Sequence, residues 1–97
     1  MEKEKIKEFA DKVFTDMAGA MGAGLGYLGT KTGLFRTMAE QGPMRLEQVV
    51  RKSGLQPRYV EEWLKGMACT GYLNYDPDAE TYELPGEHAY LLASDGT

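Results

Sequence analysis

Apolar residues in the first quarter of the chain recur at three- and four-residue steps, the spacing that places side chains on one face of an α-helix. They are Ile6, Phe9, Val13, Met17, Met21 and Leu25. A helix over residues 2–22 would be roughly 30 Å long at about 1.5 Å per residue, as long as a domain of this size is wide. We therefore expect this helix to project from the body or to pack on a partner.

A glycine-rich segment over residues 18–29 follows, with Gly19, Gly22, Gly24, Gly26 and Gly29. Each glycine inside a helix costs about 1 kcal/mol relative to alanine, so the segment needs a physical reason. The helix could break between Gly22 and Gly26, and a second helix would then carry Tyr27, Leu28 and Lys31. Alternatively, the glycines could let another helix approach closely. We expect a break or bend together with close packing.

The middle of the chain predicts three more helices, separated by glycine and proline. Two are short, one around Leu34, Phe35 and Met38 and one around Leu46, Val49 and Val50. The third begins at Pro57, which suits the first position of a helix, and ends at the capping residue Gly71. Its apolar residues follow the i, i+3, i+4, i+7 template of an amphipathic helix. The predicted core of the domain consists of Val60, Trp63, Leu64, Met67 and Leu73.

After Gly71 the period changes from helical to two, which predicts a β-hairpin. Its strands are residues 72–75 and 81–84, joined by a turn over residues 76–80, and a brief helix over 84–92 follows. Two short helices joined through Ser53-Gly54-Leu55 and followed by a hairpin make a winged helix-turn-helix. The predicted fold is mostly α with a small β-hairpin wing, extended by a long N-terminal helix.

Length and composition indicate one globular domain, because 97 residues suffice for a single modest core and 42% of them are hydrophobic. Within it we distinguish dimerisation helices over residues 1–44, the helix-turn-helix with its wing and exit helix over 45–92, and a linker over 93–97. No apolar run approaches the roughly 18 residues of a membrane span, and no signal peptide is apparent. The single cysteine, Cys69, fits a reducing cytoplasm.

The distribution of charge bears on the partner. Residues 45–75 carry a net charge of +2, whereas residues 76–97 contain six acidic residues and no basic one. In a DNA-binding version of this fold, the helix from Pro57 would enter the major groove, with Arg58, Tyr59 and Lys65 as contacts. An acidic wing would, however, repel the phosphates on which DNA affinity depends. We therefore rank binding to protein surfaces above the alternative, a DNA-binding transcriptional regulator.

Other candidate motifs carry little chemistry. The segment Gly24-Leu25-Gly26-Tyr27-Leu28-Gly29 matches G-x-G-x-x-G, but no β-strand precedes it, as a dinucleotide site would require. His88 is the only histidine and is expected at the surface or at a helix cap. Cys69 is expected to be a small, partly buried side chain without basic neighbours. We assign no catalytic, cofactor-binding or metal-binding residue.

Three stretches resemble the N-terminal domain of a bacterial group of class I S-adenosylmethionine-dependent methyltransferases. Residues 9–21 resemble its opening helix, residues 54–64 with Met67-Ala68 and Gly71-Tyr72-Leu73 its helix-turn-helix, and residues 82–89 the exit from its wing. The resemblance implies a winged-helix domain that dimerises through its helices and forms one wall of the substrate pocket. The S-adenosylmethionine site of such enzymes lies in a catalytic domain that follows the wing, and no residue here matches its motif.

These observations together predict a non-catalytic dimerisation and substrate-capping domain. We expect a homodimer joined by the first helix, with nucleic acid disfavoured as a partner, no membrane contact, and a catalytic domain in cis in the parent enzyme. The predicted dimer or substrate-wall interface is Phe9, Val13, Met17, Met21 and Leu25. A self-contained enzyme is the least favoured hypothesis.

Overall fold

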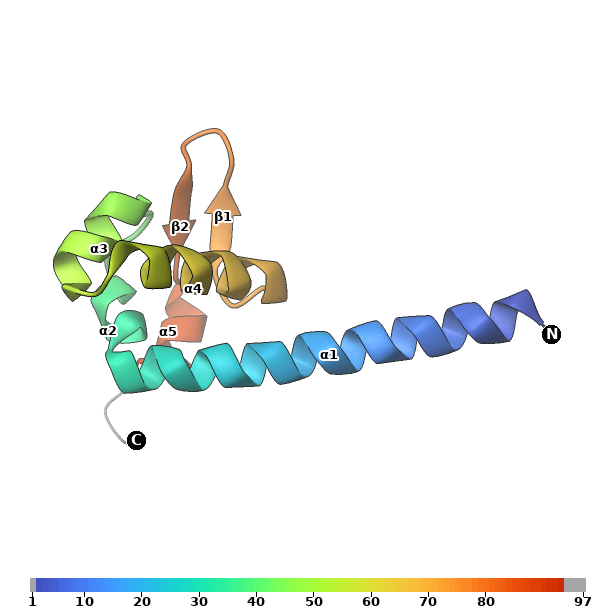
Figure 1. Cartoon of the computed structure of the whole chain (residues 1–97). Helices are drawn as coiled ribbons and strands as arrows, with labels where there is room; N and C mark the ends of the chain where they lie inside the picture. Colours follow the sequence, from blue (N-terminus) through green and yellow to red (C-terminus); the bar gives the residue numbers. More distant parts are fainter. Residues whose placement is uncertain (1, 94–97) are drawn as a thin grey trace.

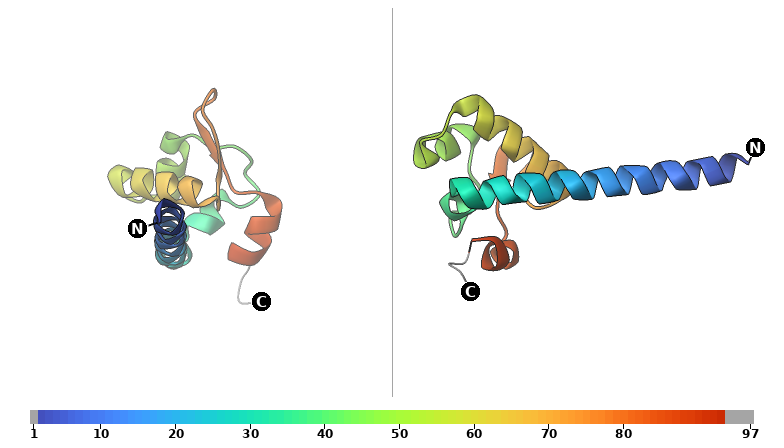
Figure 2. Two further views of the ribbon diagram at one scale, coloured as in Figure 1. Left: turned by 90° about the vertical axis from the view of Figure 1, so that its right-hand side faces the viewer. Right: turned by 60° about the horizontal axis from the view of Figure 1, so that its bottom comes forward.

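Five helices and one β-hairpin make up residues 2–93, the part of the chain that the computed structural model describes (Figure 1). In chain order they are α1 (Lys3–Thr32), α2 (Leu34–Met38), α3 (Leu46–Ser53), α4 (Pro57–Thr70), β1 (Asn74–Asp76), β2 (Thr81–Glu83) and α5 (Gly86–Leu92). The described chain is therefore mostly α with a small β wing, as predicted. The C-terminal part of α1 lies along the body formed by α2 to α5, and its N-terminal part projects beyond it (Figure 2).

The wing is an antiparallel hairpin, and its strand β2 is hydrogen-bonded to the segment that precedes α3. Its central pair is Tyr75 opposite Tyr82. The backbone of Tyr82 also exchanges two hydrogen bonds with Met44, each 2.7 Å from nitrogen to oxygen. This bridge fixes the segment before α3 against β2, so the hairpin is not an isolated two-stranded element, which would be marginally stable in water.

One hydrophobic core holds the body together, and all five residues predicted for it are buried. It contains Leu34, Phe35, Met38, Met44, Val49, Val60, Trp63, Leu64, Met67, Leu73, Tyr82 and Leu84. The rings of Phe35 and Trp63 meet edge to face with their centroids 5.1 Å apart. Helix α2 supplies three of these residues. The boundary predicted between the dimerisation helices (residues 1–44) and the helix-turn-helix (residues 45–92) therefore divides residues that share one core. The short helix α2 belongs with the winged helix.

The predicted break in the first helix is wrong, because α1 runs without interruption from Lys3 to Thr32. Three of the five glycines face the body, where a side chain would meet Thr70, Tyr72, Phe35 or Trp63. The close packing that glycine permits offsets its poor helix propensity, so the alternative of close approach describes this segment. The helix ends at Gly33, which adopts the left-handed conformation (φ 80°) that glycine accepts without strain.

The hairpin and the last helix begin later than predicted. Tyr72 and Leu73 form no strand, because their N–H groups both donate to the carbonyl of Met67 and close the end of α4. Strand β1 therefore starts at Asn74. Helix α5 starts at Gly86, after the extended residue Pro85. Most of the predicted linker, residues 94–97, lies outside the described residues.

Candidate interaction surfaces

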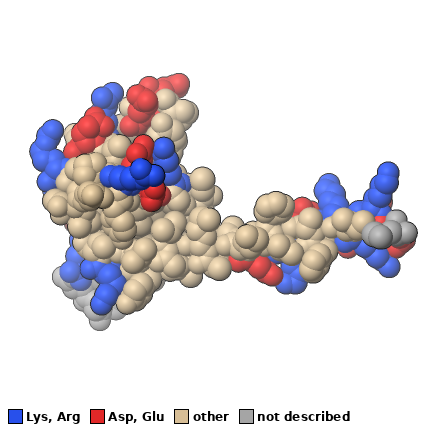
Figure 3. All heavy atoms as spheres, in the orientation of Figure 1, with Lys and Arg blue, Asp and Glu red and all other residues tan. Residues whose placement is uncertain are grey.

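The most prominent surface is an apolar stripe on α1, the residues Ile6, Phe9, Val13, Met17, Met21 and Leu28. Every one of these side chains is exposed, Phe9 by 67% and Met17 by 63%. Residues 17–30 carry no charged side chain, and Figure 3 shows a largely uncharged middle of α1 between its charged tip and the body. Monomeric soluble proteins rarely leave a contiguous apolar face of this length in water, so the stripe is a candidate interaction surface.

The opposite face of α1 is attached to the body of the same chain. The indole Nε1 of Trp63 donates a hydrogen bond to the carbonyl oxygen of Leu25 at 2.9 Å. Gly29 is buried, and a Cβ there would come within 2.6 Å of ring atoms of both Phe35 and Trp63. The Leu25 side chain contacts α4 at Gly66. Leu25 was predicted for the partner interface, but it packs against its own chain's core.

The two faces lie on opposite sides of the helix axis. Val13 precedes Gly22 by nine residues, and Met17 precedes Gly26 by the same separation. At 3.6 residues per turn this is about two and a half turns, which places each pair on opposite sides. Gly22 and Gly26 face Tyr72 in the body. A partner can therefore cover the stripe without displacing the helix from its own domain.

The outer surface of α4 is the candidate nucleic-acid surface, and acidic residues balance its cations. Arg58 Nε lies 3.4 Å from Glu62, and Lys65 Nζ lies 3.2 Å from Glu61. The wing beside it carries acidic residues and no basic one, and Asp76 organises its turn by accepting a hydrogen bond from the Asp78 N–H at 2.9 Å. This surface offers few uncompensated positive charges to a phosphate backbone.

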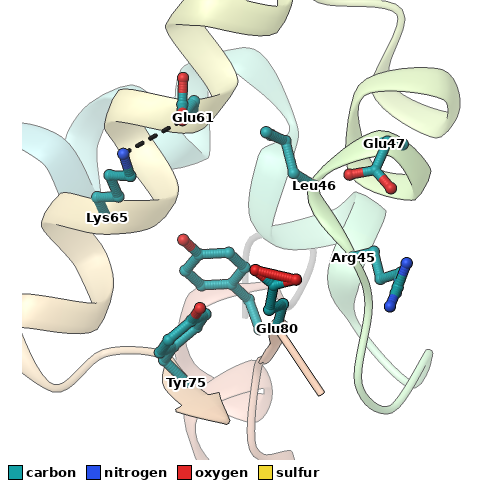
Figure 4. Close-up of a pocket in the computed structure, with 8 residues that line it drawn as sticks. Arg45, Leu46, Glu47, Glu61, Lys65, Tyr75 and Glu80 are labelled. Carbon is teal, nitrogen blue, oxygen red and sulfur yellow. Dashed lines mark ion pairs between the residues drawn. The ribbon is translucent and has the colours of Figure 1, made fainter. Parts of the chain in front are cut away.

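A pocket of about 310 Å³ lies between α4, the start of α3 and the wing (Figure 4). Tyr75 and Glu80 line it from the wing, and the Glu61–Lys65 ion pair lies on α4. The Tyr75 and Tyr82 rings are 4.8 Å apart. Burial raises the pKa of the Tyr82 phenol above its ordinary value of 10.0, and the neighbouring Tyr75 raises it further. This pocket lies on the surface that a DNA duplex would approach in a DNA-binding winged helix.

A helix-turn-helix followed by a wing, both packed on one core, makes residues 34–92 a winged-helix domain. Residues 19–94 match the family described as the Rv2258c-like winged HTH domain. The chain belongs to this family. A comparison with curated proteins finds no match. The Rv2258c-like winged HTH domain thus includes the attached half of α1, while most of the projecting half, with Ile6, Phe9, Val13 and Met17, precedes the matched residues.

Within this Rv2258c-like domain, the remaining candidate motifs have structural roles. The G-x-G-x-x-G segment lies inside α1, with helix rather than a strand before it. The Nδ1 atom of His88 is 2.8 Å from the Tyr72 carbonyl oxygen and links α5 to the end of α4. Cys69 was predicted to be partly buried, but it is exposed, because it lies one position beyond the packed residue Ala68.

The described residues offer no group of three or more histidine, cysteine, aspartate or glutamate side chains that could hold a metal ion. Among residues 2–93, no helix has the length and apolar character needed to cross a bilayer.

Four exposed apolar residues of α1 were not predicted as interface residues. They are Ile6, Phe14, Tyr27 and Leu28. Leu28 lies eleven residues after Met17, close to three helical turns, and so extends the stripe along the attached half of the helix. The expected break hid this continuity, since a second helix would have had its own orientation. Extending the three- and four-residue steps through the glycines would have identified it.

Proposed function

We propose that this chain is a dimerisation and substrate-capping domain of an S-adenosylmethionine-dependent methyltransferase and has no catalytic activity of its own. The observation that carries the proposal is the exposed apolar stripe on α1, which lies opposite the face that holds the helix to its body. The resemblance of residues 9–21, 54–73 and 82–89 to the N-terminal domain of such enzymes supplies the enzyme class.

In this proposal the winged helix serves as a rigid scaffold. The core around Trp63 and Phe35 holds α1 in place, and the Trp63–Leu25 hydrogen bond fixes the position of α1 along its axis relative to the body. A second copy covers the stripe, and the two bodies then stand at defined positions beside the dimer axis. A catalytic domain in cis would bind S-adenosylmethionine, and the winged helices would close its substrate pocket on one side.

Sedimentation velocity over a concentration range tests the dimer. We expect a concentration-dependent shift from about 11 to about 22 kDa, because burying the stripe removes apolar surface from water. A species that stays monomeric at several hundred micromolar would refute the assembly.

The enzyme class needs a separate test in the source cells. An antibody raised against residues 45–92 should detect a polypeptide longer than 97 residues that photo-crosslinks to labelled S-adenosylmethionine. The isolated chain should take up no label. A band of about 11 kDa alone, without label, would refute the methyltransferase assignment while leaving the dimer standing.

A second candidate function is DNA binding, which the winged-helix fold and the exposed Arg58 and Lys65 on α4 favour. The acidic wing and the ion pairs with Glu61 and Glu62 argue against it. Gel-shift titration on mixed-sequence duplex at low salt separates the two proposals. We expect no retardation at low micromolar protein, and retardation that weakens steeply with salt would favour the regulator.

A further inference from the structure

The stripe on α1 is symmetric about Met17 along the helix. Ile6 precedes Met17 by eleven residues and Leu28 follows it by eleven, a separation of about three turns that keeps all three on one line. Val13 and Met21 lie four residues on either side. All five side chains are exposed. A two-fold dimer needs this property, because each residue i that contacts j must find j contacting i.

From this symmetry we infer that two copies of α1 pair antiparallel, with Met17 on the two-fold axis and the projecting half of each helix on the attached half of its partner. The inference rests on the proposed function, in which α1 forms the dimer. In this register Val13 meets the partner's Met21, and Ile6 meets the partner's Leu28. The exposure of Leu28, on the part of α1 that already touches its own body, is explained by this pairing.

The glycine pattern fits the same register. Phe9 comes level with the partner's Leu25 and one residue from the partner's Gly24, which is exposed and has no atom within 4 Å of a Cβ placed on it. A helix that packs at 8–10 Å from its partner has room for a phenyl ring where the facing residue lacks a side chain. Gly24 lies eleven residues after Val13 and so lies on the stripe.

The helix dipoles favour the antiparallel direction over the parallel one. In antiparallel helices each positive N-terminal end lies beside the negative C-terminal end of the partner, whereas parallel pairing places like ends together. The side-chain charges at the ends do not select a direction, because the register places the partner's Lys31 level with Lys3 and one residue from Glu2, which already pairs with Lys5 of its own chain.

The area of the pairing is sufficient for a dimer. Six stripe side chains, each exposed by between 37% and 67%, offer roughly 80–100 Å² apiece, or about 500–600 Å² per copy. Two copies bury about 1,000–1,200 Å², at the lower limit of stable protein interfaces. Only a pairing along the whole of α1 uses all of these residues, so a crossing limited to Met17 would fall short.

Disulfide crosslinking in a Cys69→Ser background tests the register. Met17→Cys should form an interchain disulfide on mild oxidation, because this position faces itself across the axis. A mixture of Ile6→Cys and Leu28→Cys chains should crosslink, and Ile6→Cys alone should not. Asp11→Cys is the matched control, since Asp11 lies eleven residues before Gly22, on the face opposite the stripe, and should stay reduced.

Three other outcomes would overturn the inference. Crosslinking of Ile6→Cys with itself would overturn the inference in favour of parallel helices. A dimer by sedimentation without the Ile6–Leu28 crosslink would also overturn it, while the proposed function stands. A monomer by sedimentation would overturn both.

Discussion

Gly29 lies where α1 passes closest to the core, and replacing it with alanine is the sharpest test of the packing described above. A Cβ at this position would lie 2.6 Å from ring atoms of Phe35 and Trp63, distances that side-chain carbons do not adopt. Both rings are almost fully buried and in edge-to-face contact, so neither can move without disturbing the core. Overpacking of this kind costs about 1–3 kcal/mol.

Alanine also improves helix propensity by about 1 kcal/mol, and this gain must be separated from the packing cost. Gly19→Ala is the matched control, because Gly19 lies in the same helix and has nothing within 4 Å of its Cβ position. We expect Gly19→Ala to stabilise the chain by about 0.5–1 kcal/mol. Gly29→Ala should destabilise it, so that the two variants differ by about 1–3 kcal/mol.

Urea unfolding followed by circular dichroism at 222 nm measures this difference. Both variants should keep the wild-type m-value, so that the shift in midpoint reports stability alone. Neither glycine lies on the apolar stripe, so neither substitution should change dimerisation. The variants are compared at one protein concentration. Equal stabilisation by both substitutions would refute the close contact of α1 with Phe35 and Trp63.

Three further predictions concern the surfaces. Met17→Glu should weaken the dimer at least about tenfold by sedimentation, because the change is repeated in both copies, whereas Thr15→Glu, on the opposite face, should not. Because the pKa of Tyr82 is raised in the folded state, stability should fall as the pH rises above about 10, and Tyr82→Phe should reduce this loss in alkaline urea titrations. Arg58→Ala should leave the free energy of unfolding within about 0.5 kcal/mol of wild type in the same urea titration, since an exposed ion pair contributes little.

Local patterns predicted the helix-turn-helix well. The apolar template from Val60 to Met67, with Pro57 at its start and Gly71 at its end, specifies α4 completely. Strand β1 was harder to place, because Tyr72 and Leu73 have high strand propensity. Their N–H groups are used by the Met67 carbonyl instead, and such a capping contact has no signature in the alternation of residues.

The candidate site was also only partly predictable, because local patterns do not report contacts with the rest of the chain. Periodicity identified Phe9, Val13, Met17 and Met21, which all prove exposed on one side of α1. It also included Leu25, whose side chain contacts α4 at Gly66. A helical pattern reports which residues share a face, but it does not report which part of that face the rest of the chain already covers.

By itself, the sequence determined the kind and order of the main elements, the acidity of the wing and the apolar character of α1, since these follow from local propensity and charge. Only the tertiary structure decided that α1 is continuous, because the cost of its glycines is offset by contacts with Tyr72, Phe35 and Trp63, which are distant in the chain. It also decided which side of α1 remains free. The Trp63–Leu25 hydrogen bond, across 38 residues, holds one face to the body and turns the apolar stripe toward solvent.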